Sequence, residues 1–233
     1  MSEDRGILAS GAYGLDPHLA QIFGADGGQT QPFRGLATEL LVRHVDKGRR
    51  GLAVCGAASG AGVSMLAAGL ALALAQVGVD TLIVDANLRQ PSLEGLIIGG
   101  NSAKPGLLQY LQRQDVSLED MTHDQVIPDL SLVYAGGQTA QPQELFDSER
   151  FRGLASACMR QHQLVIIDTP PFSRCAEARR IAAVTGYAVV VARNGASYAR
   201  DVAALCSDLA IDGVEVVGSI LNGASTERPA KRS

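Results

Sequence analysis

The sequence lacks any hydrophobic run long enough to cross a bilayer. Its most apolar stretch extends from Leu66 to Val79, whereas a membrane-spanning helix needs about 20 apolar residues. The polar start of the chain, from Met1 to Arg5, is not followed by the apolar segment of a secretory signal. We therefore expect a cytoplasmic protein, and any role at a membrane would depend on a partner chain.

Several kinds of reactive site are also missing. The net charge of −4 gives no general attraction to nucleic acid, so no nucleic-acid partner is expected. The histidines lack metal-binding spacing, and neither a GxSxG nor a GxGxxG motif is present. These absences argue against a zinc site, a hydrolase triad and a dinucleotide site. The cysteines form no CxxC pair, which predicts buried free thiols in a reducing compartment. They are Cys55, Cys158, Cys175 and Cys206.

The length and composition predict one folded domain. The chain has 233 residues, of which 46% are hydrophobic and 19% charged, so it can bury a substantial core. Residues 1–30 show no clear periodicity, and we expect a flexible N-terminal arm there. Residues 31–222 are expected to form the folded domain, and residues 223–233 a disordered polar tail.

Within the domain, apolar strands alternate with helical patterns. Strands rich in Val, Ile and Leu are predicted at 51–55, 81–85, 129–135, 163–168, 187–192 and 214–221. Helices are predicted at 33–47, 63–77, about 106–120, 148–161, 175–185 and 197–210. The alternation predicts an α/β fold with a mostly parallel sheet and helices on both faces.

The clearest motif is a phosphate-binding loop without its lysine. The predicted strand at 51–55 leads into AASGAGVS (57–64), and an Ala/Leu-rich helix follows. This strand–loop–helix order is the context that a P-loop needs. Gly60 and Gly62 allow backbone N–H groups to face a phosphate, and Ser64 stands where a Mg²⁺-binding hydroxyl is expected. Val63 occupies the position of the lysine.

The motif predicts ATP or ADP with Mg²⁺ as the cofactor. Binding could be weakened or lost, since Val63 carries no charge, although the backbone N–H groups remain. The residues expected to contact the nucleotide are Gly60, Ala61, Gly62, Val63, Ser64 and Met65.

Two aspartates follow predicted strands. Asp85 ends the segment TLIVD, and Asp168 ends LVIID. Ligands of open parallel sheets bind at the carboxyl ends of the strands, so both carboxylates are expected beside the loop. There they could hold Mg²⁺ or its water shell together with Ser64.

These motifs stand in the order of a known family. The chain resembles the cytoplasmic domain of bacterial tyrosine kinases, the polysaccharide co-polymerase kinases related to the MinD/ParA group of P-loop ATPases. The resemblance covers about residues 31–222. The matching segments are AASGAGVS, LIVDANLRQP, AGGQTAQPQELFDSERF, LVIIDTPP and VVGSILN.

The resemblance implies roles and partners. Asp85 would help to accept the proton of an attacking tyrosine hydroxyl, Asp168 would organise the metal, and Asn222 would contact adenine. The partner would be a membrane co-polymerase, a chain-length determinant, that controls the length or export of a capsule or exopolysaccharide. The chain would then lie peripheral to the inner membrane, and subunits would form a homo-oligomeric ring.

The sequence departs from this family at catalytic positions. Besides Val63, Ala58 stands where the MinD/ParA group has a second lysine, and Asn87 replaces an aspartate of many members. Losing one contact that neutralises a phosphoryl transition state typically costs about 10²–10³ in rate. Arg89 lies near the site by motif position, but a structural or solvated arginine is the simpler interpretation.

The acceptor and assembly motifs are also altered. No tyrosine lies in the C-terminal tail, where the family has its acceptor cluster. The ring-forming Glu-x-x-Arg-x-x-Arg pattern would fall on Gln31, Arg34 and Ala37, of which only Arg34 matches.

Three hypotheses follow. The first is a regulatory, pseudokinase-like protein of polysaccharide production. The second is an active kinase that uses another cation and phosphorylates a separate protein. The third is a MinD/ParA-like positioning ATPase, against which Ala58 and the kinase-like segment at 141–145 both argue.

Overall fold

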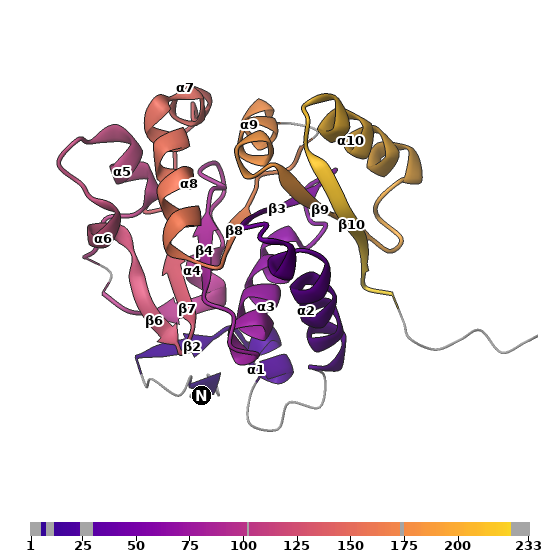
Figure 1. Ribbon diagram of the computed structural model, residues 1–233, viewed down its shortest axis with the longest axis horizontal. Helices are drawn as coiled ribbons and strands as arrows, with labels where there is room; N and C mark the ends of the chain where they lie inside the picture. The colour runs from indigo at the N-terminus through magenta and orange to yellow at the C-terminus, as the bar shows by residue number, and fades with distance from the viewer. Residues whose placement is uncertain (1–5, 8–11, 24–29, 102, 173–174, 225–233) are drawn as a thin grey trace, which may run out of the picture.

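The computed structural model describes residues 6–7, 12–23, 30–101, 103–172 and 175–224. Within them the central sheet has seven strands in the order β10-β9-β3-β8-β4-β7-β6 (Figure 1). Neighbouring strands are parallel except for the antiparallel pair β6 and β7. The strands are β3 (Gly51–Gly56), β4 (Thr81–Asp85), β6 (His123–Ile127), β7 (Leu130–Val133), β8 (Leu164–Asp168), β9 (Tyr187–Arg193) and β10 (Glu215–Asn222). The predicted α/β fold with a mostly parallel sheet is confirmed.

Helices cover both faces of this sheet. In Figure 1, α2 and α3 lie in the lower half of the molecule and α7 to α10 in the upper half. The helices are α2 (Gln31–Arg43), α3 (Val63–Gln76), α4 (Leu93–Leu96), α5 (Leu107–Gln112), α6 (Leu118–Met121), α7 (Gln143–Asp147), α8 (Glu149–Gln161), α9 (Ala176–Thr185) and α10 (Ala199–Ile211), with a short 3₁₀ turn at Val45–Lys47. Helices α8, α9 and α10 have apolar residues at helical spacing and turn that face to the core, whereas α3 is buried on all sides.

The strands are buried on both faces. Along β3, Leu52 and Val54 join the core under α3, whereas Ala53 and Cys55 join the core under α9 and α10. Successive side chains of a strand point to opposite faces. This two-sided burial explains why the strands are continuously apolar in sequence instead of alternating.

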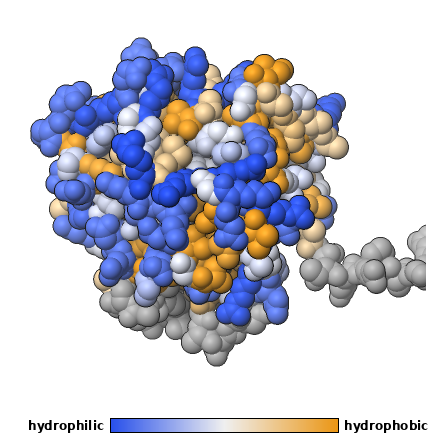
Figure 2. Space-filling model, in the orientation of Figure 1, coloured by the Kyte–Doolittle hydropathy of each residue, from blue (hydrophilic) through white to orange (hydrophobic). Residues whose placement is uncertain are grey.

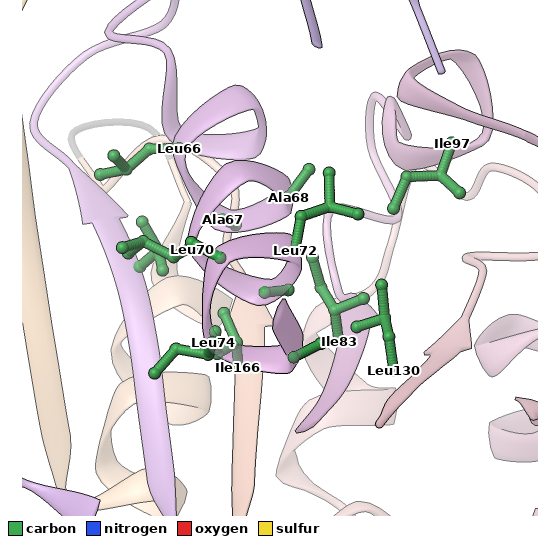
Figure 3. Close-up of a cluster of buried hydrophobic side chains, with 14 of the residues drawn as sticks. Leu66, Ala67, Ala68, Leu70, Leu72, Leu74, Ile83, Ile97, Leu130 and Ile166 are labelled. Carbon is green, nitrogen blue, oxygen red and sulfur yellow. The ribbon is translucent and has the colours of Figure 1, made fainter. Parts of the chain in front are cut away.

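Helix α3 fixes the position of the phosphate-binding loop. Ten consecutive residues of α3, from Leu66 to Ala75, are buried. Figure 3 draws Leu72 and Leu74 in one cluster with residues of the sheet such as Ile83 and Ile166. Truncating a buried leucine of this kind to alanine typically costs about 2–5 kcal/mol. The loop before α3 is therefore attached to one of the most firmly packed parts of the fold.

The expectation of a flexible arm over residues 1–30 is wrong for the described part of that segment. Strand β2 (Tyr13–Leu15) pairs with β5 (Ile97–Gly99) in a three-stranded antiparallel sheet that also includes β1 (Gly6–Ile7). Helix α1 (Pro17–Phe23) follows, and both Leu15 and Leu19 are buried. These elements are too short to produce a detectable periodicity. Residues 1–5, 8–11 and 24–29 of the expected arm, and residues 225–233 of the expected tail, lie outside the described residues.

One predicted helix is also divided. The stretch at 106–120 forms α5 and α6 as separate short helices. The second begins where the Ser117 hydroxyl accepts the N–H of Asp120 and the Asp120 carboxylate accepts the N–H of Ser117. This capping box starts a new helix after the loop that follows α5.

No helix in the described part of the chain combines the length and the hydropathy that crossing a membrane requires.

Figure 2 shows hydrophobic side chains gathered at the upper right, over the region of α10. Two large apolar residues at the ends of α10 are exposed: Ile211, its last residue, at 78%, and Tyr198, just before the helix, at 65%.

Candidate functional site

The predicted site residues meet at the carboxyl ends of the central strands. The loop between β3 and α3 contains Gly60 and Gly62, and Ser64 lies in the first turn of α3. In the register of β4 and β8, Asp85 is the direct partner of Asp168. The fold therefore brings together the loop and both carboxylates, as expected for ligand sites of parallel sheets.

The loop has the backbone conformation that its glycines predict. Gly60 and Gly62 have φ angles of 78° and 90°, in the left-handed region that side chains disfavour. A Cβ atom added to Gly62 would also lie 2.1 Å from Nδ2 of Asn222. The left-handed conformation therefore favours glycine at position 62, and a side chain there would also displace the Asn222 amide.

The loop forms one wall of a cavity of about 360 Å³. The opposite walls come from the segments that follow β4 and β8. The described residues that line it are Ala58, Ser59, Gly60, Ala61, Gly62, Val63, Ser64, Met65, Asn87, Gln90, Pro91, Ser92, Leu96, Thr169 and Pro171. None of these residues is charged, so among the described residues the attraction for a phosphate at the walls comes from backbone N–H groups and the start of α3.

Val63 lines the cavity and also contacts the protein core. It packs, partly buried, against the core beneath α3. Its Cγ2 lies 2.6 Å from the place that a Cβ atom would take at Gly56, the last residue of β3. Where a P-loop lysine would extend to the phosphates, this chain therefore has an apolar contact.

Asp168 is a buried carboxylate without a well-formed hydrogen bond. The residue is fully buried, and neither of its carboxylate oxygens has a hydrogen-bond partner. Burial raises the pKa of Asp168 well above its usual value, and the neighbouring Asp85 raises it further, while the nearby Ser64 hydroxyl favours the ionised form. An unsatisfied carboxylate beside a hydroxyl suits a hard cation such as Mg²⁺, which takes few protein ligands and keeps several waters. Ser64 and Asp168 thus fit the predicted metal.

Asp85 differs from Asp168 because the backbone already satisfies it. Its Oδ1 accepts the N–H of Asn87, and its Oδ2 accepts the N–H groups of Ser92 and Leu93, each at 3.1 Å. Burial raises the pKa of Asp85, and these three hydrogen bonds oppose that rise. An ionised carboxylate has about four lone-pair sites, so little capacity remains for a metal or a substrate proton.

Arg89 is held away from the cavity. Its Nε donates to Oε1 of Glu177 at 2.5 Å, and its Nη1 donates to the carbonyl of Ala140 at 2.9 Å. The Glu177 side chain is fully buried. The structural interpretation of Arg89 therefore fits the geometry better than a role as substitute cation.

Two side chains at the ends of β9 and β10 donate hydrogen bonds to backbone carbonyls of the loop. Arg193 Nη1 donates to the Gly60 carbonyl at 2.9 Å, and Asn222 Nδ2 donates to the Ala61 carbonyl at 3.0 Å. Asn222 was a sequence candidate for adenine contact, and it does lie beside the loop. Arg193 was missed, although its place at the end of a predicted strand could have indicated it.

The tyrosines differ sharply in exposure. Tyr13 and Tyr134 are buried, and Tyr110 and Tyr187 are half-buried beneath Arg150 and Arg49, respectively. Tyr198 alone among the five is exposed. Any acceptor tyrosine on this chain would therefore have to be Tyr198 unless the fold opened.

Proteins of similar sequence are named as bacterial tyrosine kinases. EpsB of Ralstonia nicotianae, named as a tyrosine-protein kinase, is 32% identical over 197 residues, which make up 84% of this chain and 26% of EpsB. The tyrosine-protein kinase YwqD of Bacillus subtilis is 28% identical over 194 residues, or 83% of this chain and 81% of YwqD. The chain thus spans about a quarter of EpsB and most of YwqD. No protein-family model matches the chain.

Solved structures agree with these similarities. The kinase domain of the Escherichia coli tyrosine kinase Etk superposes with a TM-score of 0.80 at 26% identity, covering 92% of this chain and 82% of that domain. MinD of Pyrococcus horikoshii, solved with Mg-ADP, has a TM-score of 0.62 at 18% identity and shares the fold, covering 78% of this chain and 74% of MinD. With its ordered loop, strand-end aspartates and kinase relatives, the chain belongs to the bacterial tyrosine-kinase family of the MinD/ParA-like P-loop proteins.

Proposed function

We propose that this protein is a regulatory, pseudokinase-like member of its family that acts with a membrane co-polymerase in the production and export of a capsule or exopolysaccharide. The observation that carries the pseudokinase part is the cavity at the phosphate-binding loop, whose described lining includes no charged side chain. Phosphoryl transfer spreads negative charge over the transferred oxygens, and no side-chain cation among the described lining residues could stabilise it.

The surrounding residues support the same conclusion. Arg89 is engaged with Glu177, and Asp85 is engaged with backbone N–H groups. A substitute cation and a catalytic base would both need to break existing contacts before acting. The active-kinase alternative therefore requires a rearrangement, possible only at the cost of a buried ion pair or three hydrogen bonds.

Nucleotide binding fits the site better than catalysis does. The loop N–H groups can hold a diphosphate, and Ser64 with Asp168 can hold Mg²⁺. A P-loop lysine normally reaches the β- and γ-phosphates, so its absence should weaken ATP binding more than ADP binding. We therefore propose that the protein is a sensor of ADP with Mg²⁺ rather than a consumer of ATP.

The proposed place of action follows from the family. A co-polymerase in the inner membrane would recruit the protein from the cytoplasm, and nucleotide occupancy would adjust the recruited state. The positioning-ATPase alternative receives less support, because the similar proteins at the higher identities carry kinase names, whereas MinD shares only the fold.

Calorimetry with Mg-ADP and Mg-ATP tests this proposal, using the native chain beside Val63→Lys. We expect micromolar Mg-ADP binding by the native chain, weaker Mg-ATP binding, and a gain of about tenfold or more for ATP in the variant. In parallel, the purified chain should not phosphorylate itself, and Tyr198→Phe provides the control for the exposed tyrosine. Robust tyrosine phosphorylation by the native chain would overturn the pseudokinase proposal.

A further inference from the structure

The loop carbonyls that face away from the cavity are held by two neighbouring strands. Arg193 and Asn222 are direct partners in the register of β9 and β10. Arg193 donates to the Gly60 carbonyl, and Asn222 donates to the next carbonyl, that of Ala61. Two consecutive peptide groups of the loop are therefore fixed by one pair of residues at the end of the sheet.

This pairing determines where the loop N–H groups point. In a trans peptide the C=O and the following N–H point in opposite directions. Holding the carbonyls of Gly60 and Ala61 toward β9 and β10 turns the N–H groups of Ala61 and Gly62 to the other side, where the cavity lies. Neither N–H has an acceptor among the described residues. They are free donors, as in other backbone anion sites.

The two contacting side chains are themselves well placed. The backbone N–H of Asn194 donates to the Asn222 carbonyl at 2.9 Å, which ties the two strand ends together. The N–H of Arg193 donates to the Ser197 hydroxyl at 2.9 Å, which closes the turn after β9. The contacts to the loop thus start from backbone positions that are fixed independently of the loop.

We propose that Arg193 and Asn222 are positioning residues that hold the lysine-free loop in a conformation that accepts the phosphates of a nucleoside diphosphate. The inference rests on the proposed nucleotide binding and assigns it a structural cause. A P-loop with a lysine attracts phosphate by direct charge, whereas this loop depends on preorganised N–H groups. Neither residue needs to touch the ligand for this role.

The test uses Mg-pyrophosphate, which has no adenine and so separates this role of Asn222 from a contact with the base. Amide resonances of Ala61 and Gly62 are followed by NMR during titration of the full chain. We expect Arg193→Gln and Asn222→Ala each to weaken binding about threefold to tenfold and to reduce the shifts of these two amides. Arg193→Lys should recover part of the affinity.

Arg200→Gln is the matched control. It removes the same charge from an 81% exposed side chain in the first turn of α10, where Arg200 contacts Asp201 and Tyr198. Melting temperatures of all variants establish that each is folded. Equal weakening by Arg200→Gln and Arg193→Gln would overturn the proposal, because it would indicate a general charge effect.

Repeating the titration in a Val63→Lys variant distinguishes failure of this inference from failure of the proposed function. If the native chain binds neither Mg-ADP nor pyrophosphate, the nucleotide-sensor proposal fails, and the titration is repeated in Val63→Lys. Weaker binding on adding Arg193→Gln to that variant would support the positioning role. Unchanged binding, or no binding by Val63→Lys with both contacts intact, would overturn it.

Discussion

Asp85 and Asp168 lie opposite each other on parallel strands, both fully buried, yet only Asp85 is satisfied by backbone hydrogen bonds. One carboxylate of the pair is bound by the backbone, and the other has no hydrogen-bond partner among the described residues. Their similar positions in sequence motifs conceal this difference. The pair therefore predicts opposite outcomes for the same chemical substitution.

We expect Asp85→Asn to destabilise the protein by about 2–3 kcal/mol. The asparagine amide would place N–H groups against backbone N–H groups that now donate to the carboxylate. Thermal and urea unfolding would measure the loss. A variant as stable as the native chain would show that the three hydrogen bonds contribute little. Because of this instability, Asp85→Asn is a poor probe of catalysis.

Asp168→Asn should have the reverse effect in the absence of nucleotide. Removing a buried charge without partners should raise the free energy of unfolding at pH 8, because the ionised carboxylate is disfavoured by burial. The same change should abolish the dependence of ADP affinity on Mg²⁺, measured by calorimetry with and without the metal. Retention of that dependence would contradict the assignment of Asp168 as a metal ligand.

The raised pKa of Asp168 also predicts a pH dependence. A carboxyl group with a raised pKa in the folded state contributes stability at low pH, and this contribution is lost as the pH rises through the folded pKa. Without Mg²⁺, the native chain should therefore lose stability relative to Asp168→Asn as the pH rises toward neutral. Added Mg-ADP should reduce that loss. Parallel stability curves for the two proteins would refute the prediction.

The pKa of His44 predicts the opposite pH dependence of stability, a loss as the pH falls. His44 is fully buried beside Tyr187, and burial lowers its pKa despite the hydrogen bond between its Nε2 and the Gly51 carbonyl. A lowered histidine pKa gives stability that is present above the ordinary value of 6.5 and is lost as the pH falls below it. Unfolding free energies of His44→Gln should change less than those of the native chain between about pH 6.5 and 5. If the unfolding free energies of both proteins changed equally with pH, groups other than His44 would be responsible for the acid sensitivity.

Arg89→Met tests whether this arginine serves the fold or a phosphate. The substitution leaves the Glu177 carboxylate buried without its cation, which should cost about 2–3 kcal/mol of stability. Affinity for Mg-ADP, measured below the melting transition, should stay within about twofold of the native value. The double variant Arg89→Met/Glu177→Gln should recover part of the stability. A large loss of affinity with unchanged stability would instead place Arg89 in the nucleotide site.

The main features of the fold could be predicted because they depend on local patterns. The buried strands and long helices have continuous or periodic apolar residues, and the loop at 57–64 has its glycines where left-handed backbone occurs. The antiparallel strand β6 escaped prediction because only parts of it are apolar, and β2 because three residues form no period. Tertiary pairing with β7 and β5 creates these strands.

Some residues of the candidate site could be predicted from sequence motifs, and some of its contacts could not. Sequence motifs identified Ser64, Asp85 and Asp168, since each follows a strand or loop with a recognisable pattern. They could not reveal that backbone N–H groups occupy Asp85 or that Arg193 contacts Gly60, because both depend on how segments meet in three dimensions.

The contacts behind the loop also have a consequence for synthesis. Gly60 and Ala61 receive their hydrogen bonds from residues 133 and 161 positions later in the chain. On the ribosome, β3, the loop and α3 therefore emerge long before the two residues that hold them. The phosphate-binding loop can reach its final shape only when β10, the last strand, has joined the sheet. If the protein binds nucleotide as proposed, that binding would also require the last described strand to be folded.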